Sequence, residues 1–588
     1  MARDRIDWRN IKNGRELPKE HYCDQPYAVI TAEGHWLCVM TTGRGLEGES
    51  GQHVVSTISA DKGLTWTALV DIEPAGGPEA SWAMPLVVPG GRVYVFYLYN
   101  ADNIRQVAGG HFDGEPGEVL HERVDTLGYM VFKYSDDHGR TWSAQRHTIP
   151  IRSFEIDRRN RHRGEVQYLW GVGKPMVQEG AVYIGFAKVG SFGPGWMAES
   201  EGAFLRSDNI LEESDPTRIR WQTLPEGDFG LRAPLGPVGD EHNPVGLNDG
   251  SLYCTFRTVA GHNAQSYSRD GGRSWTKPEH AAYSPGGRAI KHPRAANFVK
   301  KFANGKYLLW YHNHGRSFIE RPWLAYADRN PAWVSGGVER DGVIHWSQPE
   351  VLLYDDDPAV RISYPDFIED GGDYYVTETQ KEIARVHPID KALLEGMWAQ
   401  GERRQVDREG LLLELDREAC ASGASHALPG FGALSEGGSF SLELWLSMDS
   451  LAPGQVVADA TDAAGQGFRL VTIEAGALRL ELSDGRSGAY WDSDSGILRA
   501  GSLQHVAVIV DGGPKLILFV ADGVLCDGGA QRQFGWGRFG PTLGTVGAAG
   551  RELAAAPSLN GRLHGLRLYG QAMTVSQAVA QHLAGMEG

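Results

Sequence analysis

The sequence predicts an all-β protein in which a repeated four-stranded unit is followed by a second β-rich domain. Three observations support this prediction. The turn pattern S-x-D-x-G-x-(S or T)-W occurs three times. Six segments share the same order of proline, apolar run, glycine turn and second apolar run. Beyond about residue 410, short segments alternate apolar and polar residues, as antiparallel strands with one buried face do.

Each position of the turn pattern has a physical role. Its copies span residues 59–66, 135–142 and 268–275. The aspartate can accept hydrogen bonds from turn amides, the glycine can adopt positive φ, and the tryptophan opens the next strand. Because every copy follows an apolar, β-rich stretch, the copies indicate a repeated hairpin with a structural role.

The six proline-led segments define the repeated units and two opposite surfaces. They begin near Pro26, Pro85, Pro175, Pro244, Pro293 and Pro365. This organisation fits four-stranded blades joined by loops of variable length. The first strand of each unit runs from the proline cluster to the glycine turn, and the second strand returns. We therefore expect a functional site where the proline clusters meet the loops after the second strands, on the face opposite the repeated turns.

The pattern changes near residue 388. Residues 389–398 read as a short helix, residues 399–409 as a charged linker, and residues 410–588 as a separate β-rich domain. The predicted domains are therefore 1–398 and 410–588. The final strand pattern at 559–569, followed by a helix, resembles the end of laminin-G-like or concanavalin-like jelly rolls, which implies a C-terminal β-sandwich.

Composition narrows the classes of function. The formal charge of −17 argues against a nucleic-acid partner, and no stretch is apolar enough to span a membrane. Five cysteines without a CxxC spacing indicate buried thiols, so we expect no disulfide framework, metal or cofactor. The charged beginning of the chain lacks the apolar core of a secretory signal. We expect a soluble, cytoplasmic protein, or a secreted one if a signal segment has been removed; the oligomeric state is not predicted.

The three turns resemble the Asp-boxes of the sialidase (neuraminidase) superfamily, which implies a six-bladed β-propeller over roughly residues 20–390. In the fourth unit, Glu241 stands at the top of strand one and Arg257 at the top of strand two. The resemblance implies that Glu241 polarises a nucleophilic tyrosine and that Arg257 holds a substrate carboxylate. Tyr364, at the start of the sixth unit, is the implied nucleophile. Asp366 is close enough in sequence to compete for a catalytic role.

The resemblance also places an acid/base residue in the loop after strand two of the first unit. That loop, residues 42–53, contains no aspartate but offers Glu47, Glu49 and His53. A third arginine is expected from the fifth unit. Its candidates are Arg294, Arg316 and Arg321.

The chain departs from the family at the first unit, where Gln25 stands in place of an arginine that precedes the proline. A glutamine cannot form a charged bidentate clamp on a carboxylate, so the three-arginine clamp is incomplete or rebuilt. This speaks against sialic acid itself and leaves a saccharide site. The same face offers polar and aromatic groups suited to sugars: Tyr27, Glu79, Trp82, Lys174, His242, Asn243, His292, His312, Gln380 and Lys381.

Three functions are compatible with these residues. The leading one is an exo-acting glycoside hydrolase that releases a terminal, anionic sugar from an oligo- or polysaccharide, with retention if Tyr364 is the nucleophile. The second is a polysaccharide lyase, in which histidine and tyrosine transfer protons at a uronic acid and leave an unsaturated, ultraviolet-absorbing product. The third is a non-catalytic glycan-binding protein, which would bind the sugar and release nothing.

Overall fold

The computed structural model describes residues 6–109, 119–121, 125–193, 196–321, 324, 327–421, 423–548 and 551–586. The chain divides into two compact units. The first comprises Met1–Trp346 and Pro358–Lys391, and the second comprises Ser347–Asp357 and Ala392–Gly588. Residues 347–357 therefore group with the second unit, although the sequence gives no sign that they leave the first.

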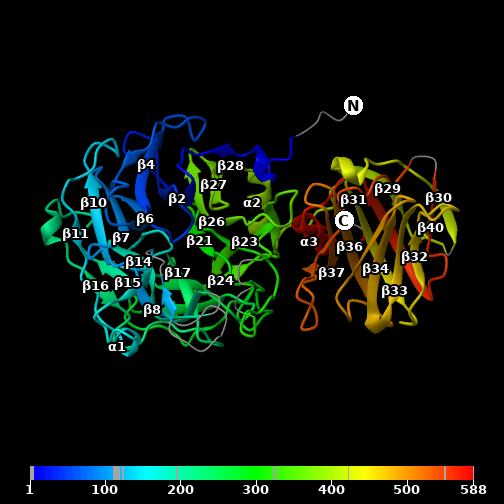
Figure 1. Ribbon diagram of the computed structural model, residues 1–588. Helices are drawn as coiled ribbons and strands as arrows, with labels where there is room; N and C mark the ends of the chain where they lie inside the picture. Colours follow the sequence, from blue (N-terminus) through cyan, green and yellow to red (C-terminus); the bar gives the residue numbers. More distant parts are fainter. Residues whose placement is uncertain are drawn as a thin grey trace. The chain divides into compact units, whose positions relative to one another are not determined.

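The first unit is a six-bladed β-propeller of antiparallel sheets, as predicted (Figure 1). Blade 1 consists of β2 (Tyr22–Ile30), β3 (Trp36–Gly43), β4 (His53–Ser59) and β5 (Val70–Asp71). Blade 2 consists of β6 (Ala80–Val87), β7 (Val93–Tyr99), β10 (Tyr129–Ser135) and β11 (His147–Thr148). In blade 3, β12 (Tyr168–Trp170) and β13 (Met176–Gln178) both pair with β14 (Ala181–Gly193), followed by β15 (Trp196–Ser207) and β16 (Gln222–Leu224).

The remaining blades follow the same plan. Blade 4 consists of β17 (Gly239–Gly246), β18 (Leu252–Thr258), β19 (Ala264–Ser268) and β20 (Glu279–His280). Blade 5 contains β21 (Phe298–Lys301), β22 (Tyr307–Tyr311), β23 (Ala332–Arg340) and β24 (Val343–Trp346). Blade 6 contains β26 (Ser363–Asp370), β27 (Asp373–Thr379) and β28 (Ala384–Ile389). Short elements lie between blades: β8 (Val107–Gly109) paired with β9 (Val119–His121), and helix α1 (Glu155–Arg159).

The outermost strand of blade 6 comes from the beginning of the chain. Strand β1 (Arg15–Glu16) pairs with β28, with Arg15 opposite Val386 and Glu16 opposite Arg385. Strand β2 contacts both β6 and β26, so the first and last blades are neighbours. The ring of blades is thus closed by main-chain pairing between two ends of the propeller sequence, with β1 as the outer strand of blade 6.

The three Asp-box turns lie between the third and fourth strands of blades 1, 2 and 4, and their hydrogen bonds are nearly identical. In each, the serine hydroxyl accepts the glycine amide at 2.8 Å. The aspartate accepts the hydroxyl of the later threonine or serine at 2.6 Å, and that residue's amide at 2.8–2.9 Å. The pattern therefore builds one turn three times, with its polar groups satisfied locally.

Four inner strands carry a β-bulge at their beginning. Register breaks in β2, β6, β17 and β26, where Gln25, Trp82, Glu241 and Tyr364 have φ of 52°, 67°, 53° and 48°. A bulge adds one residue to a strand and redirects the side chain. Positive φ in such residues costs on the order of 1–3 kcal/mol and is often associated with functional sites. The bulges thus redirect Glu241 and Tyr364 at corresponding positions of two blades.

The second unit is the predicted β-sandwich. One sheet contains β29 (Leu411–Leu415), β41 (Gly561–Tyr569), β31 (Phe440–Met448), β36 (Leu503–Asp511), β37 (Leu516–Ala521), β38 (Val524–Leu525) and β39 (Gly537–Arg538). The other contains β30 (Ala424–Leu428), β40 (Arg551–Ala555), β32 (Val456–Asp459), β33 (Gly467–Ile473), β34 (Ala477–Ser483) and β35 (Gly488–Asp492). The unit also holds β25 (Glu350–Leu353), α2 (Lys391–Trp398) and α3 (Val575–Ala584).

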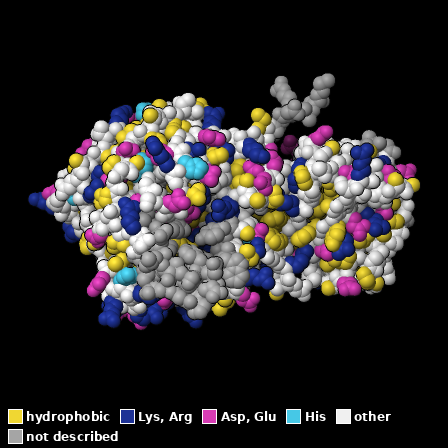
Figure 2. Space-filling view, viewed as in Figure 1, with side chains coloured by type: hydrophobic (Ala, Val, Ile, Leu, Met, Phe, Trp, Pro, Cys, Tyr) yellow, Lys and Arg dark blue, Asp and Glu magenta, His cyan; other side chains and the backbone are white. Residues whose placement is uncertain are grey.

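Apolar residues fill the interior of each unit. In the propeller, Val39 of blade 1 and Val95 of blade 2 belong to one cluster between the sheets. In the sandwich, Leu444 of one sheet and Leu480 of the other share a single core. The five cysteines are free and buried, as predicted. Searching the described helices for one that is long and apolar enough to cross a membrane yields none. Figure 2 shows basic and acidic side chains intermingled on the visible surface of the propeller.

Candidate active site

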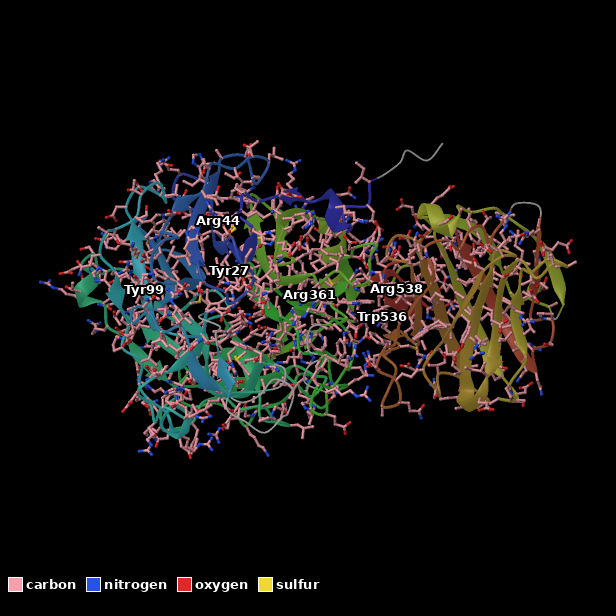
Figure 3. The ribbon with its side chains drawn as sticks, in the orientation of Figure 1. Tyr27, Arg44, Tyr99, Arg361, Trp536 and Arg538 are labelled. Carbon is pink, nitrogen blue, oxygen red and sulfur yellow. The ribbon has the colours of Figure 1, made fainter. Side chains whose placement is uncertain are left out.

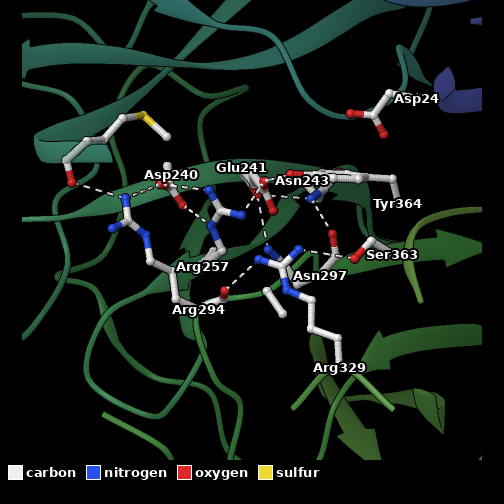
Figure 4. A network of polar contacts seen from close by, with 12 residues as sticks. Asp24, Asp240, Glu241, Asn243, Arg257, Arg294, Asn297, Arg329, Ser363 and Tyr364 are labelled. Atoms are coloured by element: carbon white, nitrogen blue, oxygen red, sulfur yellow. Dashed lines mark hydrogen bonds and ion pairs between the residues drawn. The ribbon is translucent and has the colours of Figure 1, made fainter. Parts of the chain in front are cut away.

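Glu241, Arg257 and Tyr364 meet in the interior of the propeller (Figure 4). The Tyr364 hydroxyl donates to Glu241 Oε1 at 2.9 Å, and Arg257 Nη1 lies 2.6 Å from the same oxygen. Burial, and then the Glu241 charge, raise the pKa of Tyr364 well above its usual value. Burial also raises the pKa of Glu241, against the opposing charge of Arg257. Burial therefore keeps the phenol protonated, and its hydroxyl is hydrogen-bonded to the Glu241 carboxyl group.

Asp240, which the sequence analysis did not single out, completes this network. Arg257 Nε and Nη2 donate to its two carboxylate oxygens at 2.6 and 3.0 Å, and Arg294 Nη2 lies 3.6 Å away. Burial opposes ionisation of Asp240, but the Arg257 charge keeps its pKa below the usual range. The β17 bulge explains why two adjacent residues both reach the arginines, since it interrupts the alternation of side chains.

The third arginine of the network is Arg329, and sequence reasoning missed it. Arg329 donates to Ser363 Oγ at 3.1 Å and to the carbonyl of Arg294 at 3.0 Å. Of the predicted candidates, only Arg294 joins the network; Arg316 pairs with Asp328 instead. Arg329 lies three residues before β23, at the end of the loop that follows β22. Its place in a loop after a second strand is the sequence feature that could have indicated it.

Arg321, the remaining candidate, is exposed. Its carbonyl accepts the amide of Leu324 at 3.1 Å. Because this backbone contact belongs to a local turn, it gives Arg321 no link to the buried arginines.

Lys381 links two carboxylates to the nucleophile candidate. Its Nζ lies 2.5 Å from Asp24 Oδ2, 3.3 Å from Glu47 Oε1 and 4.2 Å from the centre of the Tyr364 ring. Asp24 also accepts the Tyr22 hydroxyl at 2.9 Å, and burial raises the pKa of Asp24 despite the opposing Lys381 charge. Of the three predicted acid/base candidates, Glu47 is thus the one that is linked to Tyr364 through Lys381. Asp24 was not predicted.

The other two acid/base candidates have local partners. Glu49 accepts the amide of Leu46 at 2.8 Å, which closes a turn. His53 lies with Nδ1 3.0 Å from the carbonyl of Glu73 and is almost fully buried. Glu79, expected to bind substrate, accepts the amide of Gly51 at 3.0 Å. These contacts stabilise loops of blades 1 and 2.

Asp366 and Lys174 form a separate ion pair at 2.7 Å. Asp366 accepts the amide of Ala28 at 2.8 Å, and Lys174 donates to the carbonyl of the same residue at 2.6 Å. This pairing joins blades 1, 3 and 6 through their inner strands. Asp366 is thus bonded to Lys174 and to the backbone of Ala28, and its catalytic role stays a prediction.

The histidines predicted to bind substrate are interior packing residues. His242 stacks on Phe256, with ring centroids 4.3 Å apart, and burial lowers its pKa to about 3. His292 Nε2 lies 2.9 Å from the carbonyl of Ala295, and burial lowers its pKa to about 3 as well. His312 donates its amide to His292 Nδ1 at 3.1 Å. Burial keeps these rings neutral near pH 7, and their contact with a sugar stays a prediction.

Two aromatic residues predicted at the site also belong to the core. Trp82 is fully buried, with its ring 4.2 Å from that of Trp170. Tyr27, labelled in Figure 3, is buried and stacks on Phe298 at 6.2 Å. The β6 bulge turns Trp82 into the space between blades 2 and 3, where its side chain packs in the core.

Three amide side chains differ in their surroundings. Asn243 donates to the carbonyls of Glu241 and Asn297, both at 2.9 Å, and so fixes the bulge that carries Glu241. Gln380 accepts from Arg385 at 2.7 Å. Gln25 is fully buried at the β2 bulge, and neither end of its amide has a hydrogen-bond partner within the described part of the chain.

The blades, Asp-box turns and buried polar network define a sialidase-like β-propeller joined in sequence to a concanavalin-like sandwich. The chain belongs to the BNR repeat-like domain family, whose model matches residues 82–376. Residues 421–578 match the concanavalin A-like lectin/glucanases superfamily. No curated protein matches the sequence.

Several solved structures resemble the chain in fold. Trypanosoma rangeli sialidase in complex with 2,3-difluorosialic acid is 12% identical, with a TM-score of 0.44, over 98% of this chain and 96% of that one. NanB sialidase from Streptococcus pneumoniae is 13% identical, with a TM-score of 0.43, over 63% and 68% of the two chains. A Dyadobacter fermentans protein of unknown function is 14% identical, with a TM-score of 0.43, over 64% and 97%.

Proposed function

We propose that this protein is an exo-acting glycoside hydrolase in which Tyr364 is the nucleophile and Glu241 its base. The supporting observation is the 2.9 Å hydrogen bond from the Tyr364 hydroxyl to Glu241 Oε1. A phenol is a weak nucleophile near neutral pH unless an adjacent base takes its proton. Arg257, 2.6 Å from the same oxygen, holds the carboxylate in place and favours its ionised form.

The reaction proceeds in two displacements. As the Tyr364 oxygen bonds to the anomeric carbon, its proton passes to Glu241, and the glycosidic C–O bond breaks while an acid protonates the leaving oxygen. Water then attacks the anomeric carbon, the acid residue now acts as a base, and Tyr364 leaves and regains its proton. Two inversions give net retention.

We propose Glu47 as the acid/base. Its side chain keeps 24% of its surface exposed and lies 3.3 Å from Lys381, whereas Asp24 on the same lysine is fully buried. A group that exchanges protons with a leaving oxygen and then with water needs access to both. Lys381, which lies over the Tyr364 ring, positions Glu47 beside the nucleophile.

A glycan is the ligand class that fits both parts of the chain. The propeller belongs to a sialidase-like repeat family, and residues 421–578 match a superfamily of lectins and glucanases. We therefore propose that the propeller cleaves an oligo- or polysaccharide and that the sandwich contributes glycan binding.

The decisive experiment is glycan-array hydrolysis with product analysis. We expect Tyr364→Phe to lower kcat/KM by on the order of a thousandfold or more and Glu241→Gln by roughly a hundredfold or more. Tyr129→Phe is the matched control, because Tyr129 donates to Asp102 at 2.7 Å in an exposed pair. Full activity of both site variants would show the assignment to be wrong, and an unsaturated product absorbing in the ultraviolet would favour a lyase.

A further inference from the structure

The arginines suited to hold a substrate carboxylate already hold one that belongs to the protein. Arg257 Nε and Nη2 donate to the two carboxylate oxygens of Asp240 at 2.6 and 3.0 Å, and its Nη1 lies 2.6 Å from Glu241 Oε1. Arg294 lies 3.6 Å from Asp240 and donates to the carbonyl of Met197 at 3.0 Å. The Nε–Nη2 edge of Arg257, one of the two guanidinium edges that can hold a planar carboxylate, is therefore occupied by Asp240, and Glu241 bonds Nη1 of the other edge.

The third arginine, Arg329, also forms hydrogen bonds within the protein. Arg329 donates to Ser363 and to the carbonyl of Arg294. A substrate carboxylate that approached the Nε–Nη2 edge of Arg257 would have to displace Asp240. Displacing Asp240 is unfavourable, because its carboxylate is fully buried and would be left without its countercharge.

The cations gathered at the inner strands have carboxyl groups of the chain as neighbours. Lys174 lies beside Asp366, Lys381 beside Asp24 and Glu47, and Arg257 beside Asp240 and Glu241. Each of these cations thus has an acidic partner within the chain, which weakens the attraction of this face for an anionic ligand.

Gln25 adds an independent observation. It occupies the β2 bulge, the counterpart of the Tyr364 bulge on the adjacent strand β26, and its buried amide leaves a donor and an acceptor without partners in the described residues. A sugar hydroxyl satisfies both a donor and an acceptor, whereas an ionised carboxylate accepts only. The amide therefore suits an uncharged polyol better than an acid.

We infer that the terminal sugar taken by this site is uncharged, because Asp240 occupies the Nε–Nη2 edge of Arg257 and lies beside Arg294, where a substrate carboxylate would bind. This rests on the proposed function only for placing the sugar at Tyr364. It departs from the anionic sugar expected from sequence. The Tyr364–Glu241 pair is compatible with a neutral sugar, since transfer of the phenol proton to Glu241 leaves the charge of the pair unchanged.

The test uses the full chain on one glycan array before and after methyl esterification of all carboxyl groups, with binding read on Tyr364→Phe and hydrolysis on the wild type. We expect binding confined to glycans with uncharged terminal sugars and altered less than twofold by esterification. Binding confined to carboxylated sugars and abolished by esterification would overturn the inference, as would no binding to either class. Binding of neutral sugars without hydrolysis would refute the proposed function and leave the inference standing.

A second arm changes the selectivity directly. Asp240→Asn leaves two Arg257 nitrogens facing an amide, so we expect it to bind N-acetylneuraminic acid or D-glucuronic acid at least tenfold more tightly than the wild type. The matched control is Asp136→Asn, which removes a carboxylate 2.6 Å from Arg92 on the outer surface of blade 2. Equal affinities in the folded variant and the wild type would contradict the role given to Asp240, and the array result decides the matter if the variant does not fold.

Discussion

Individual residues of the propeller interior owe their chemistry to burial more than to their place in a motif. His242 lies between Glu241 and Asn243 in the sequence, yet its ring packs on Phe256 and its Nε2 lies 3.2 Å from the carbonyl of Leu231. Burial lowers the pKa of His242 to about 3, from an ordinary value of 6.5. A group kept neutral in this way makes the stability of the fold depend on pH.

Acid should therefore destabilise the protein partly through His242. Between pH 6.5 and 3 the unfolded chain binds a proton there that the folded chain does not, so this contribution is complete above pH 6.5 and is lost as pH falls. Each such group changes the free energy of unfolding by up to about 1.4 kcal/mol per pH unit. We expect His242→Phe to flatten the dependence measured by urea unfolding between pH 4 and 6. An unchanged slope in His242→Phe would contradict this view.

At the scale of the strand, the bulges decide which residues meet. The sequence predicted the inner strands and Asp-boxes because their signals are local: a proline cluster, a glycine turn, a fixed octet. The resemblance to the sialidase superfamily also indicated Glu241, Arg257 and Tyr364 as site residues. It missed Asp240 because alternation along β17 places neighbouring residues on opposite faces, and only the bulge overrides that rule. The position of Arg329 depends on the path of the loop between β22 and β23, and no short sequence pattern predicts that path.

The positive φ of a bulge can be tested at Gln25, where φ is 52°. Asparagine tolerates this region, and a β-branched residue does not. We expect Gln25→Val to be less stable than Gln25→Asn by about 1–2 kcal/mol, measured as the difference in free energy of urea unfolding. Each variant serves as the control of the other, since both remove the glutamine amide. Equal stabilities would mean that the strand relaxes out of the bulge.

The Asp-box turns should govern stability without governing the site. Asp270 accepts from Ser268 and Ser274 through three hydrogen bonds of 2.6–2.9 Å. Asp270→Ala should lower the free energy of unfolding by roughly 1–2 kcal/mol and leave KM unchanged. Thermal unfolding and steady-state kinetics on the same preparation check both expectations. A raised KM with unchanged stability would contradict the separation of the turn face from the site face.

At the scale of the whole propeller, stability depends on how the ring closes. Strand β1 has only two residues and pairs with β28, some 370 positions later in the chain. No periodicity in the sequence therefore predicts this pairing. The residues around it are nevertheless buried: Ile11 and Leu17 are only 1% and 2% exposed. The segment before β2 is thus part of the last blade, and the pairing of blade 6 depends on it.

Gly14 gives a sharp test of that closure. A Cβ added there would overlap the ring of His387, a fully buried side chain of β28, so Gly14→Ala must displace that ring or the segment that leads into β1. We expect a loss of about 1–3 kcal/mol and faster hydrogen exchange of the β28 amides. Gly90→Ala, where no atom lies within 4 Å of the added Cβ, is the matched control and should be nearly neutral. If Gly14→Ala kept β28 fully protected, the beginning of the chain would not be what closes the ring, and the stability of blade 6 would have to come from its own three strands.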